Sequence, residues 1–312
     1  MALIIPREVG EQLLDAQGAM DALRPVMVEE AAGTTLHMPP FGGSKSARPT
    51  FRLVGGGLYG MQRMGVRAGA TQLFDTETGR LLAIVGGATQ WRVAATMGLG
   101  AQYLARPDAA RVGLLGSGRN ALPILQCLAL VRPIDRVDLF SPTPAHRERL
   151  AEQATQALNI PVTAHDNPRP AIADADILVV GTSSYSPVVS FSDLHPGMHV
   201  TSMGMSVELD ESVYLQVDQV VAPSAEQEID SHNPIAAPHI EGVLYQLVNA
   251  GRWDSSRIVE LGSIIEGEVP ARNGADDINL FRESRGGPGD IALANWVYER
   301  ARERGLGVEI DL

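Results

Sequence analysis

The sequence of 312 residues contains one cysteine, Cys127, and one lysine, Lys45. A lone cysteine excludes an intrachain disulfide, a zinc site built from several thiolates and a redox pair of thiols. Arginine supplies all the other side-chain cations, histidine aside, so a mechanism that needs a lysine base or a Schiff base has one candidate. The histidines show no metal-ligand spacing, and we predict no metal.

Long apolar runs and clusters of basic residues are also missing. No stretch of about 18 apolar residues occurs, which argues against a transmembrane helix. The start, MALIIPREVGEQL, has no basic segment before its short apolar patch, so we expect no signal peptide and a cytoplasmic location. The 37 acidic and 25 basic residues give a net charge of −12, which disfavours a nucleic-acid surface. We therefore expect a small-molecule partner, with no nucleic acid and no membrane.

Short apolar segments alternate with helical patterns in the middle of the chain. This alternation is typical of an α/β fold with a doubly wound parallel sheet, as in Rossmann domains. The expected order is strand 112–115, helix 121–130, strand 136–140, helix 145–158, and further strands at 177–180 and 199–203. We predict that this dinucleotide-binding domain spans residues 111–290.

The flanking segments follow other patterns and predict a second, smaller α+β domain. Apolar spacing in the two end segments is helical, whereas short β-like runs between residues 50 and 85 predict an antiparallel or mixed sheet. The expected helices are 6–32, 91–104 and 291–304. Because the last helix is expected to pack back on the first part, the second domain would comprise residues 1–110 with 291–312.

The motif Gly116-Ser117-Gly118-Arg119-Asn120-Ala121 lies directly between a predicted strand and a predicted helix. In this G-x-G-x-x-A pattern the first glycine permits a tight turn, and the second lets a pyrophosphate approach the backbone. The N–H groups at the helix start would face the phosphates. We therefore expect a dinucleotide here rather than a purely structural turn.

The choice of nucleotide should be set after the second strand, where NAD enzymes often carry an acidic residue. This chain has Ser141 and Thr143 there, followed by Arg147, and no acid. A neutral rim rich in hydrogen-bond donors favours NADP(H) over NAD(H), with NAD(H) as the alternative. The small residues after the strand 177–180 are expected to border the nicotinamide ribose: Thr182, Ser183 and Ser184.

Several motifs together resemble the ornithine cyclodeaminase/μ-crystallin family. They are ATQWRVAA at 88–95, YLARPDA at 103–109, GSGRNA at 116–121, FDTETG at 74–79 and DINLF at 277–281. The resemblance implies a homodimer with a Rossmann domain and a substrate-binding and dimerisation domain. It also implies hydride transfer between a nicotinamide and the α-carbon of an amino or imino acid.

The resemblance assigns roles to single residues. Arg92 matches the arginine that binds the substrate carboxylate, and Thr89 matches a family threonine that we assign to the cofactor side. Arg67 occupies the place of a family lysine; arginine keeps the charge but does not exchange a proton near neutral pH. Only three residues separate Gly204 from Glu208, which leaves no counterpart of the aspartate that cyclodeaminases use. Both departures argue against cyclisation of ornithine.

Other candidates have alternative roles. Arg52 is expected to help Arg92 and Arg67 bind the substrate, although an ordinary surface arginine is the alternative. His37 or Lys45 could give the imine nitrogen its proton, and water is a third source. Gly204 and Asp290 are further expected at the cofactor; for Asp290, which starts the last family helix, helix capping is the alternative.

The resulting expectation is an NAD(P)H-dependent reductase of a small imine or α-imino acid, which in reverse is an amino acid dehydrogenase. A cyclodeaminase-type lyase that recycles its NAD is one alternative. A non-catalytic NADPH-binding protein, like the crystallin members of the family, is the other.

Overall fold

The computed structural model describes residues 1–41, 53–203, 206–229, 242–283 and 286–311. The described chain forms two compact units. Unit 1 contains residues 1–92 and 286–311, and unit 2 contains residues 93–229 and 242–283, apart from those not described. In the described part, no helix is long and apolar enough to cross a membrane.

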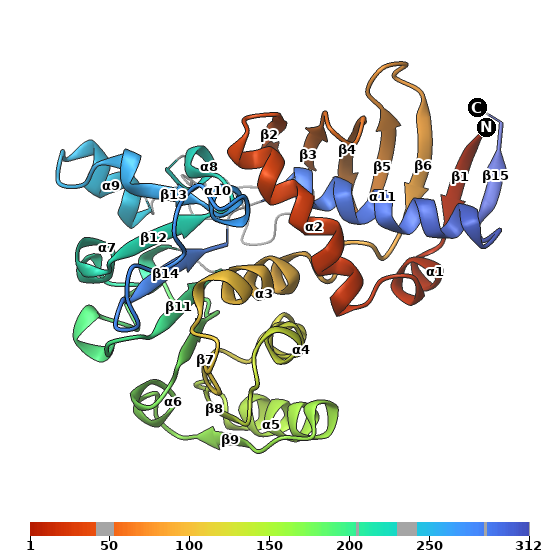
Figure 1. Ribbon diagram of the computed structural model, residues 1–312. Coiled ribbons are helices and arrows are strands. Elements are labelled where there is room, and N and C mark those ends of the chain that lie inside the picture. Colours follow the sequence, from red (N-terminus) through yellow and green to blue (C-terminus); the bar gives the residue numbers. More distant parts are fainter. Residues whose placement is uncertain (42–52, 204–205, 230–241, 284–285, 312) are drawn as a thin grey trace. The chain divides into compact units, whose positions relative to one another are not determined.

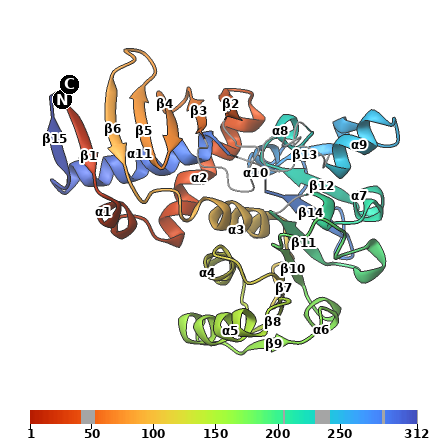
Figure 2. The same cartoon turned by 180° about the vertical axis from the view of Figure 1, so that it is seen from behind.

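Unit 1 is built on a seven-stranded sheet with the order β15-β1-β6-β5-β4-β3-β2. All neighbouring strands are antiparallel except β1 and β6. The two chain termini meet where β1 pairs with β15 (Figures 1 and 2). The strands are β1 (Ala2–Ile5), β2 (Thr35–Phe41), β3 (Leu53–Leu58), β4 (Arg63–Ala68), β5 (Ala70–Asp75), β6 (Leu81–Val85) and β15 (Val308–Ile310).

One face of this sheet is covered by helices. Helix α11 (Pro288–Glu303) crosses the strands, as Figure 1 shows, and α2 (Ala16–Ala31) packs against α11. Two glycines let α11 come close: a Cβ on Gly56 would lie 2.7 Å from the Pro288 nitrogen, and one on Gly65 would lie 2.7 Å from Ile291 Cδ1. The short α1 (Arg7–Gln12) completes the helices of this unit. The expected packing of the last helix on the first part is therefore observed.

The opposite face of the same sheet carries apolar side chains. Val66 lies between Gly55 and Gln72 in register, and Met64 lies between Gly57 and Phe74. On β2, Leu36 is 49% exposed and Met38 is 36% exposed. Large apolar side chains clustered on an exposed surface mark an interaction site in soluble proteins.

Unit 2 contains an eight-stranded sheet in which every neighbouring pair is parallel. Its order is β13-β12-β14-β11-β10-β7-β8-β9. The strands are β7 (Arg111–Leu115), β8 (Arg136–Phe140), β9 (Val162–His165), β10 (Ile177–Val180), β11 (His199–Ser202), β12 (Gln219–Ala222), β13 (Ile258–Glu260) and β14 (Asn279–Arg282). The central strands β14, β11 and β10 are buried along their whole length, and β10 is a continuous apolar run, as expected where both faces of a sheet are covered. This confirms the predicted α/β class.

Helices connect and flank these strands. They are α3 (Arg92–Leu104), α4 (Ala121–Val131), α5 (Pro144–Leu158), α6 (Arg169–Ala173), α7 (Glu211–Gln216), α8 (Ala225–Ile229), α9 (Val243–Asn249) and α10 (Leu261–Ile265), with 3-10 turns at Phe191–Asp193, Ser206–Glu208 and Ser255–Arg257. Helix α4 buries Ile124, Leu125 and Leu128 and packs against α5. Cys127 is fully buried in the same helix, which raises the pKa of its thiol to about 12. A protonated, buried thiol is inert, as expected for core packing.

The division between the units differs from the domain boundaries expected at 110/111 and 290/291. From Val93 on, α3 belongs to unit 2, where Gly100 of α3 packs against the Phe281 ring of β14. The segment 286–290 belongs to unit 1 because it leads into α11. The sequence pattern of α3 predicts the helix but does not tell which unit the helix joins.

Candidate active site

The glycine motif of unit 2 forms the turn between β7 and α4. Gly116 has φ +119°, and a Cβ there would overlap the carbonyl oxygen of Gly181, so only glycine fits. At Gly118 a Cβ would meet no described atom within 4 Å. The backbone at Gly118 is thus open to an approaching ligand, as the motif predicts for a pyrophosphate.

The start of α4 is suited to bind an anion. Asn120 precedes the helix without a side-chain capping bond, and its amide nitrogen lies 3.6 Å from the Met203 sulfur. Arg119 is exposed beside it. The first N–H groups of a helix of this length carry a partial positive charge and lack partners within the helix. Phosphate groups are the usual ligands of such a helix start.

The residues after β8 lie beside this turn. The hydroxyl of Ser117 donates to Ser141 Oγ at 2.8 Å, and Arg147 Nη1 donates to the Ser141 carbonyl at 3.1 Å. Ser141 is buried, whereas Thr143, which precedes α5, is exposed. The structure therefore brings Ser117, Ser141 and Arg147 together at the position where nucleotide-binding folds distinguish their ribose groups.

The loop after β10 borders the same turn through Gly181. Thr182, however, uses its hydrogen-bonding groups inside the protein: its N–H and its hydroxyl both donate to Glu208 Oε2 at 2.8 Å. The Ser184 N–H donates to Thr182 Oγ1 at 3.0 Å. Ser183 lies between them and is exposed. The sequence placed these residues at the correct edge of the sheet but did not anticipate the role of Glu208.

In unit 1, two arginines converge on one buried carboxylate. Asp290 is 1% exposed; its Oδ2 accepts from Arg67 Nε at 2.8 Å, and its Oδ1 lies 3.4 Å from Arg92 Nε. Arg67 points toward the helix-covered face of β4, and Arg92 begins α3, where its N–H donates to the Thr89 carbonyl. Residues that lie 223 positions apart in the sequence thus form one cluster.

The position of Asp290 excludes the capping role considered above. Gly287 is the N-cap of α11, so Asp290 is the third residue of the helix. Its Oδ1 accepts no hydrogen bond from the described residues, although the Arg92 ion pair lies close. A carboxylate in this place orients the Nε edges of both guanidinium groups, which fixes the direction of their terminal nitrogens.

His37 lies on the same face of the sheet. It pairs with Gly56, which in turn pairs with Gly65, so all three positions face α11. His37 Nε2 contacts Glu30 Oε2 at 2.5 Å, and the Thr35 hydroxyl donates to the same oxygen at 2.9 Å. Glu30, on α2, is 8% exposed. This buried glutamate fixes the histidine ring, and it was not identified from the sequence.

Three predicted residues lie outside the described part of the chain: Lys45, Arg52 and Gly204. In the part that is described, no group of three or more His, Cys, Asp or Glu residues could hold a metal ion.

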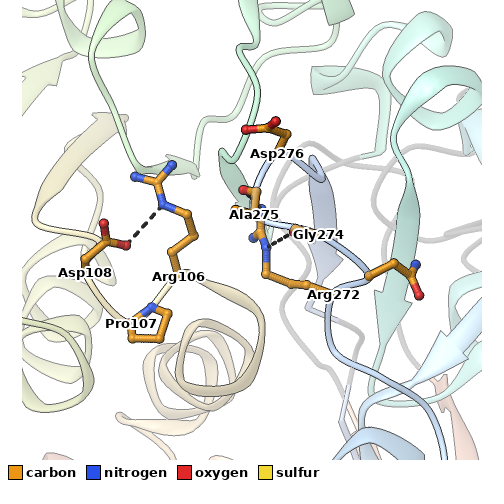
Figure 3. Close-up of a pocket in the computed structure, with 8 residues that line it drawn as sticks. Arg106, Pro107, Asp108, Arg272, Gly274, Ala275 and Asp276 are labelled. Atoms are coloured by element: carbon orange, nitrogen blue, oxygen red, sulfur yellow. Dashed lines mark hydrogen bonds and ion pairs between the residues drawn. The ribbon is translucent and has the colours of Figure 1, made fainter.

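A hollow of about 650 Å³ lies elsewhere in unit 2, between the loop after α3 and the loop before β14 (Figure 3). Its two arginines are engaged in holding the fold. Arg106 binds Asp108 and Asp176, and Arg272 donates to the carbonyls of Leu104, Gly197 and Asp277. The adjacent strand ends, Arg111 and Asn279, are the amino ends of their strands. Ligands of parallel sheets bind at the carboxyl ends, so we assign this hollow no part in the site.

Comparisons with known proteins show the family and the fold of the chain. The model of the ornithine cyclodeaminase/mu-crystallin family matches residues 16–305. A Delta(1)-pyrroline-2-carboxylate reductase of Bacillus cereus is 30% identical over 249 residues, which cover 78% of this chain and 74% of the relative. An iminosuccinate reductase of Paracoccus denitrificans is 29% identical over 242 residues, covering 77% and 72%. The solved structure of a Thermococcus litoralis Delta(1)-pyrroline-2-carboxylate reductase, in complex with NADH and L-proline, has a TM-score of 0.87 at 23% identity and covers 99% of this chain and 100% of that one.

Proposed function

Because the chain belongs to the ornithine cyclodeaminase/mu-crystallin family, we propose that it is an NAD(P)H-dependent reductase of a small imino acid. The name of the relative from Bacillus cereus supports a cyclic imine with a carboxylate as substrate. The name of the relative from Paracoccus denitrificans supports a linear imino acid. In reverse the reaction is the oxidation of an amino acid.

The observation that carries this proposal is the cluster of Arg67, Arg92 and Asp290. Two guanidinium groups beside one buried carboxylate leave an excess positive charge among these three groups, which suits a substrate carboxylate. Arg92 would hold the α-carboxylate, and Arg67 would assist it. Neither arginine gives up a proton near neutral pH, so the proton for the imine nitrogen has another source, for which we retain His37, Lys45 and water.

The described residues of unit 2 fit a dinucleotide. The open backbone at Gly118 and the uncapped start of α4 would hold the pyrophosphate, and Ser117, Ser141 and Arg147 would contact the adenosine ribose. When bound, the nicotinamide supplies a hydride to the imine carbon. The nitrogen then gains one proton, and the product is the amino acid. The protein contributes the orientation of the carboxylate and the placement of that proton.

The proposal is tested by oxidation of NADPH and NADH with two substrate sets. One set contains cyclic imines with a 2-carboxylate, and the other contains α-keto acids with ammonia or methylamine. Turnover with one of these supports the reductase. Release of ammonia from ornithine without net change of the cofactor would instead support a cyclodeaminase-type lyase, and tight NADPH binding without turnover would support a crystallin-like protein.

We propose that NADP(H) is preferred over NAD(H), because the rim at Ser141 is neutral and Arg147 lies beside it. Ser141→Asp should place a negative charge where a 2′-phosphate would lie and should lower the ratio of kcat/KM for NADPH over NADH by about tenfold or more. Steady-state kinetics with both cofactors measure this ratio. A wild-type protein that already prefers NADH tenfold would contradict the proposal.

We also propose that the chain forms a homodimer through the face of the unit 1 sheet that lies opposite α11 and carries Val66 and Met64. Val66 lies in the middle of that face, so Val66→Asp would bury an unpaired charge in the interface. We expect this variant to be monomeric at micromolar concentration in light scattering after gel filtration. Gln153→Asp, at an exposed position of α5, is the matched control and should stay dimeric. A monomeric wild type would overturn this part of the proposal.

A further inference from the structure

The loop that follows β10 is closed at both ends by one residue, Glu208. At its start, Glu208 Oε2 accepts from the N–H and the hydroxyl of Thr182, each at 2.8 Å. At its far end, the Glu208 carbonyl accepts from the Val188 N–H at 2.8 Å, and Val189 pairs with Leu209 in a parallel bridge. The side chain and the main chain of one residue therefore fix the two ends of the segment 182–188.

Hydroxyl groups hold the segment between these ends. Thr182 Oγ1 accepts from the Ser184 N–H at 3.0 Å, and Ser184 Oγ donates to the Ser186 carbonyl at 2.7 Å. Tyr185, at the tip, is 65% exposed. Because the Thr182 hydroxyl proton points to Glu208, this threonine shapes the loop and does not donate to a ligand.

The stability of the fold alone does not account for a carboxyl group at position 208. The residue is fully buried, and its Oε1 has no hydrogen-bond partner among the described residues. Burial raises the pKa of this carboxyl group, while the bonds from Thr182 and the charge of Arg282 oppose the rise. A buried carboxyl group with an unsatisfied oxygen costs free energy that an apolar side chain of the same size would not. Its presence therefore points to a task that needs the Thr182 contacts.

The loop lies where a dinucleotide passes. Strands β7 and β10 are neighbours, with Leu115 opposite Val180, so the glycine turn and the loop leave the sheet side by side. The Gly181 carbonyl lies against the backbone of Gly116. In doubly wound folds, the cofactor crosses the carboxyl ends of the strands at this edge.

We propose that Glu208 is a positioning residue for the nicotinamide half of the cofactor, because it holds the segment 182–188 in the shape that borders this half. The inference rests on the nucleotide site proposed above. Glu208 does not touch the reacting atoms; it acts through Thr182 and the loop backbone.

Two variants of Glu208 test the inference. Glu208→Leu removes the acceptor at nearly constant volume and leaves the Thr182 N–H and hydroxyl unpaired, whereas Glu208→Gln retains a carbonyl oxygen for both. We expect Glu208→Leu to weaken NADPH and NADH binding on the order of tenfold, and Glu208→Gln to stay within about threefold of wild type. The dissociation constants follow from fluorescence titration. Glu211→Leu, an exposed glutamate on α7 that binds Arg252, is the control and should bind like wild type.

A second probe separates positioning from general damage. ADP and 2′,5′-ADP contain only the adenosine half of the cofactor, so their affinity should be unchanged in Glu208→Leu. An equal loss for these probes would show a general loss of structure and would overturn the inference, as would wild-type NAD(P)H affinity in Glu208→Leu. Failure of the wild-type protein to bind any nicotinamide dinucleotide would instead overturn the proposed function.

Discussion

Replacement of Gly118 by valine is expected to abolish NAD(P)H binding and to leave the melting temperature within about 2 °C of wild type. A Cβ at this position would meet no described protein atom within 4 Å, and the backbone is not in the left-handed region. The valine therefore has space in the free protein and collides only with a ligand that approaches the backbone. Calorimetric titration with NADPH and thermal unfolding of the same samples measure the two effects.

Gly116, the first glycine of the motif, provides a control in which the substitution is expected to lower stability. Gly116 combines φ +119° with contact to the Gly181 carbonyl, so Gly116→Ala should lose roughly 1–3 kcal/mol of stability even without nucleotide. A valine at position 118 that left the affinity for NADPH unchanged would remove the cofactor from this turn.

The parallel sheet of unit 2 could be predicted because its signals are local. Strands expected at 112–115, 136–140 and 177–180 occur as Arg111–Leu115, Arg136–Phe140 and Ile177–Val180. Each is a short segment rich in Val, Leu and Ile, although Asp138 interrupts the second, and buried parallel strands favour such segments. The glycine motif could also be recognised in the sequence, because its strand, its turn and its helix follow one another directly.

The contacts that join Arg67, Arg92 and Asp290 in unit 1 could not be predicted from the sequence. The sequence and the family resemblance singled out Arg67, Arg92 and Asp290, but Asp290 was assigned to the cofactor or to helix capping. Its contact with Arg67 depends on how closely α11 approaches the sheet, and that distance is set by Gly56 on β3 and Gly65 on β4. Such a long-range condition leaves no periodicity in the sequence.

Glu30 and Glu208 show a second limit of the sequence. Both are buried acids whose partners, His37 and Thr182, become neighbours only through the fold. In a sequence, a glutamate is by default a solvated side chain. Burial of the carboxyl group, which gives each of these residues its significance, is a tertiary property.

Arg92→Ala is expected to lower kcat/KM for the best imine substrate about 30- to 4,000-fold and to leave nucleotide affinity nearly unchanged. Loss of one partner of a charge-assisted pair in a partly dry site costs roughly 2–5 kcal/mol, which gives this range. The fold should survive because Asp290 keeps its 2.8 Å bond to Arg67. Arg92→Lys should recover only part of the activity, since an ammonium group retains the charge without the planar pair of donors.

The matched control for this prediction is Arg63, which points to the same face of β4 as Arg67. Arg63 donates to Asn295 and Glu299 of α11, so Arg63→Ala should change stability slightly and kcat/KM little. Arg67→Lys, which introduces the family lysine, should shift the range of accepted substrates more than the melting temperature. If Arg92→Ala retained wild-type kcat/KM, the substrate carboxylate would not bind at the Asp290 cluster, and a crystallin-like nucleotide-binding protein would become the better description.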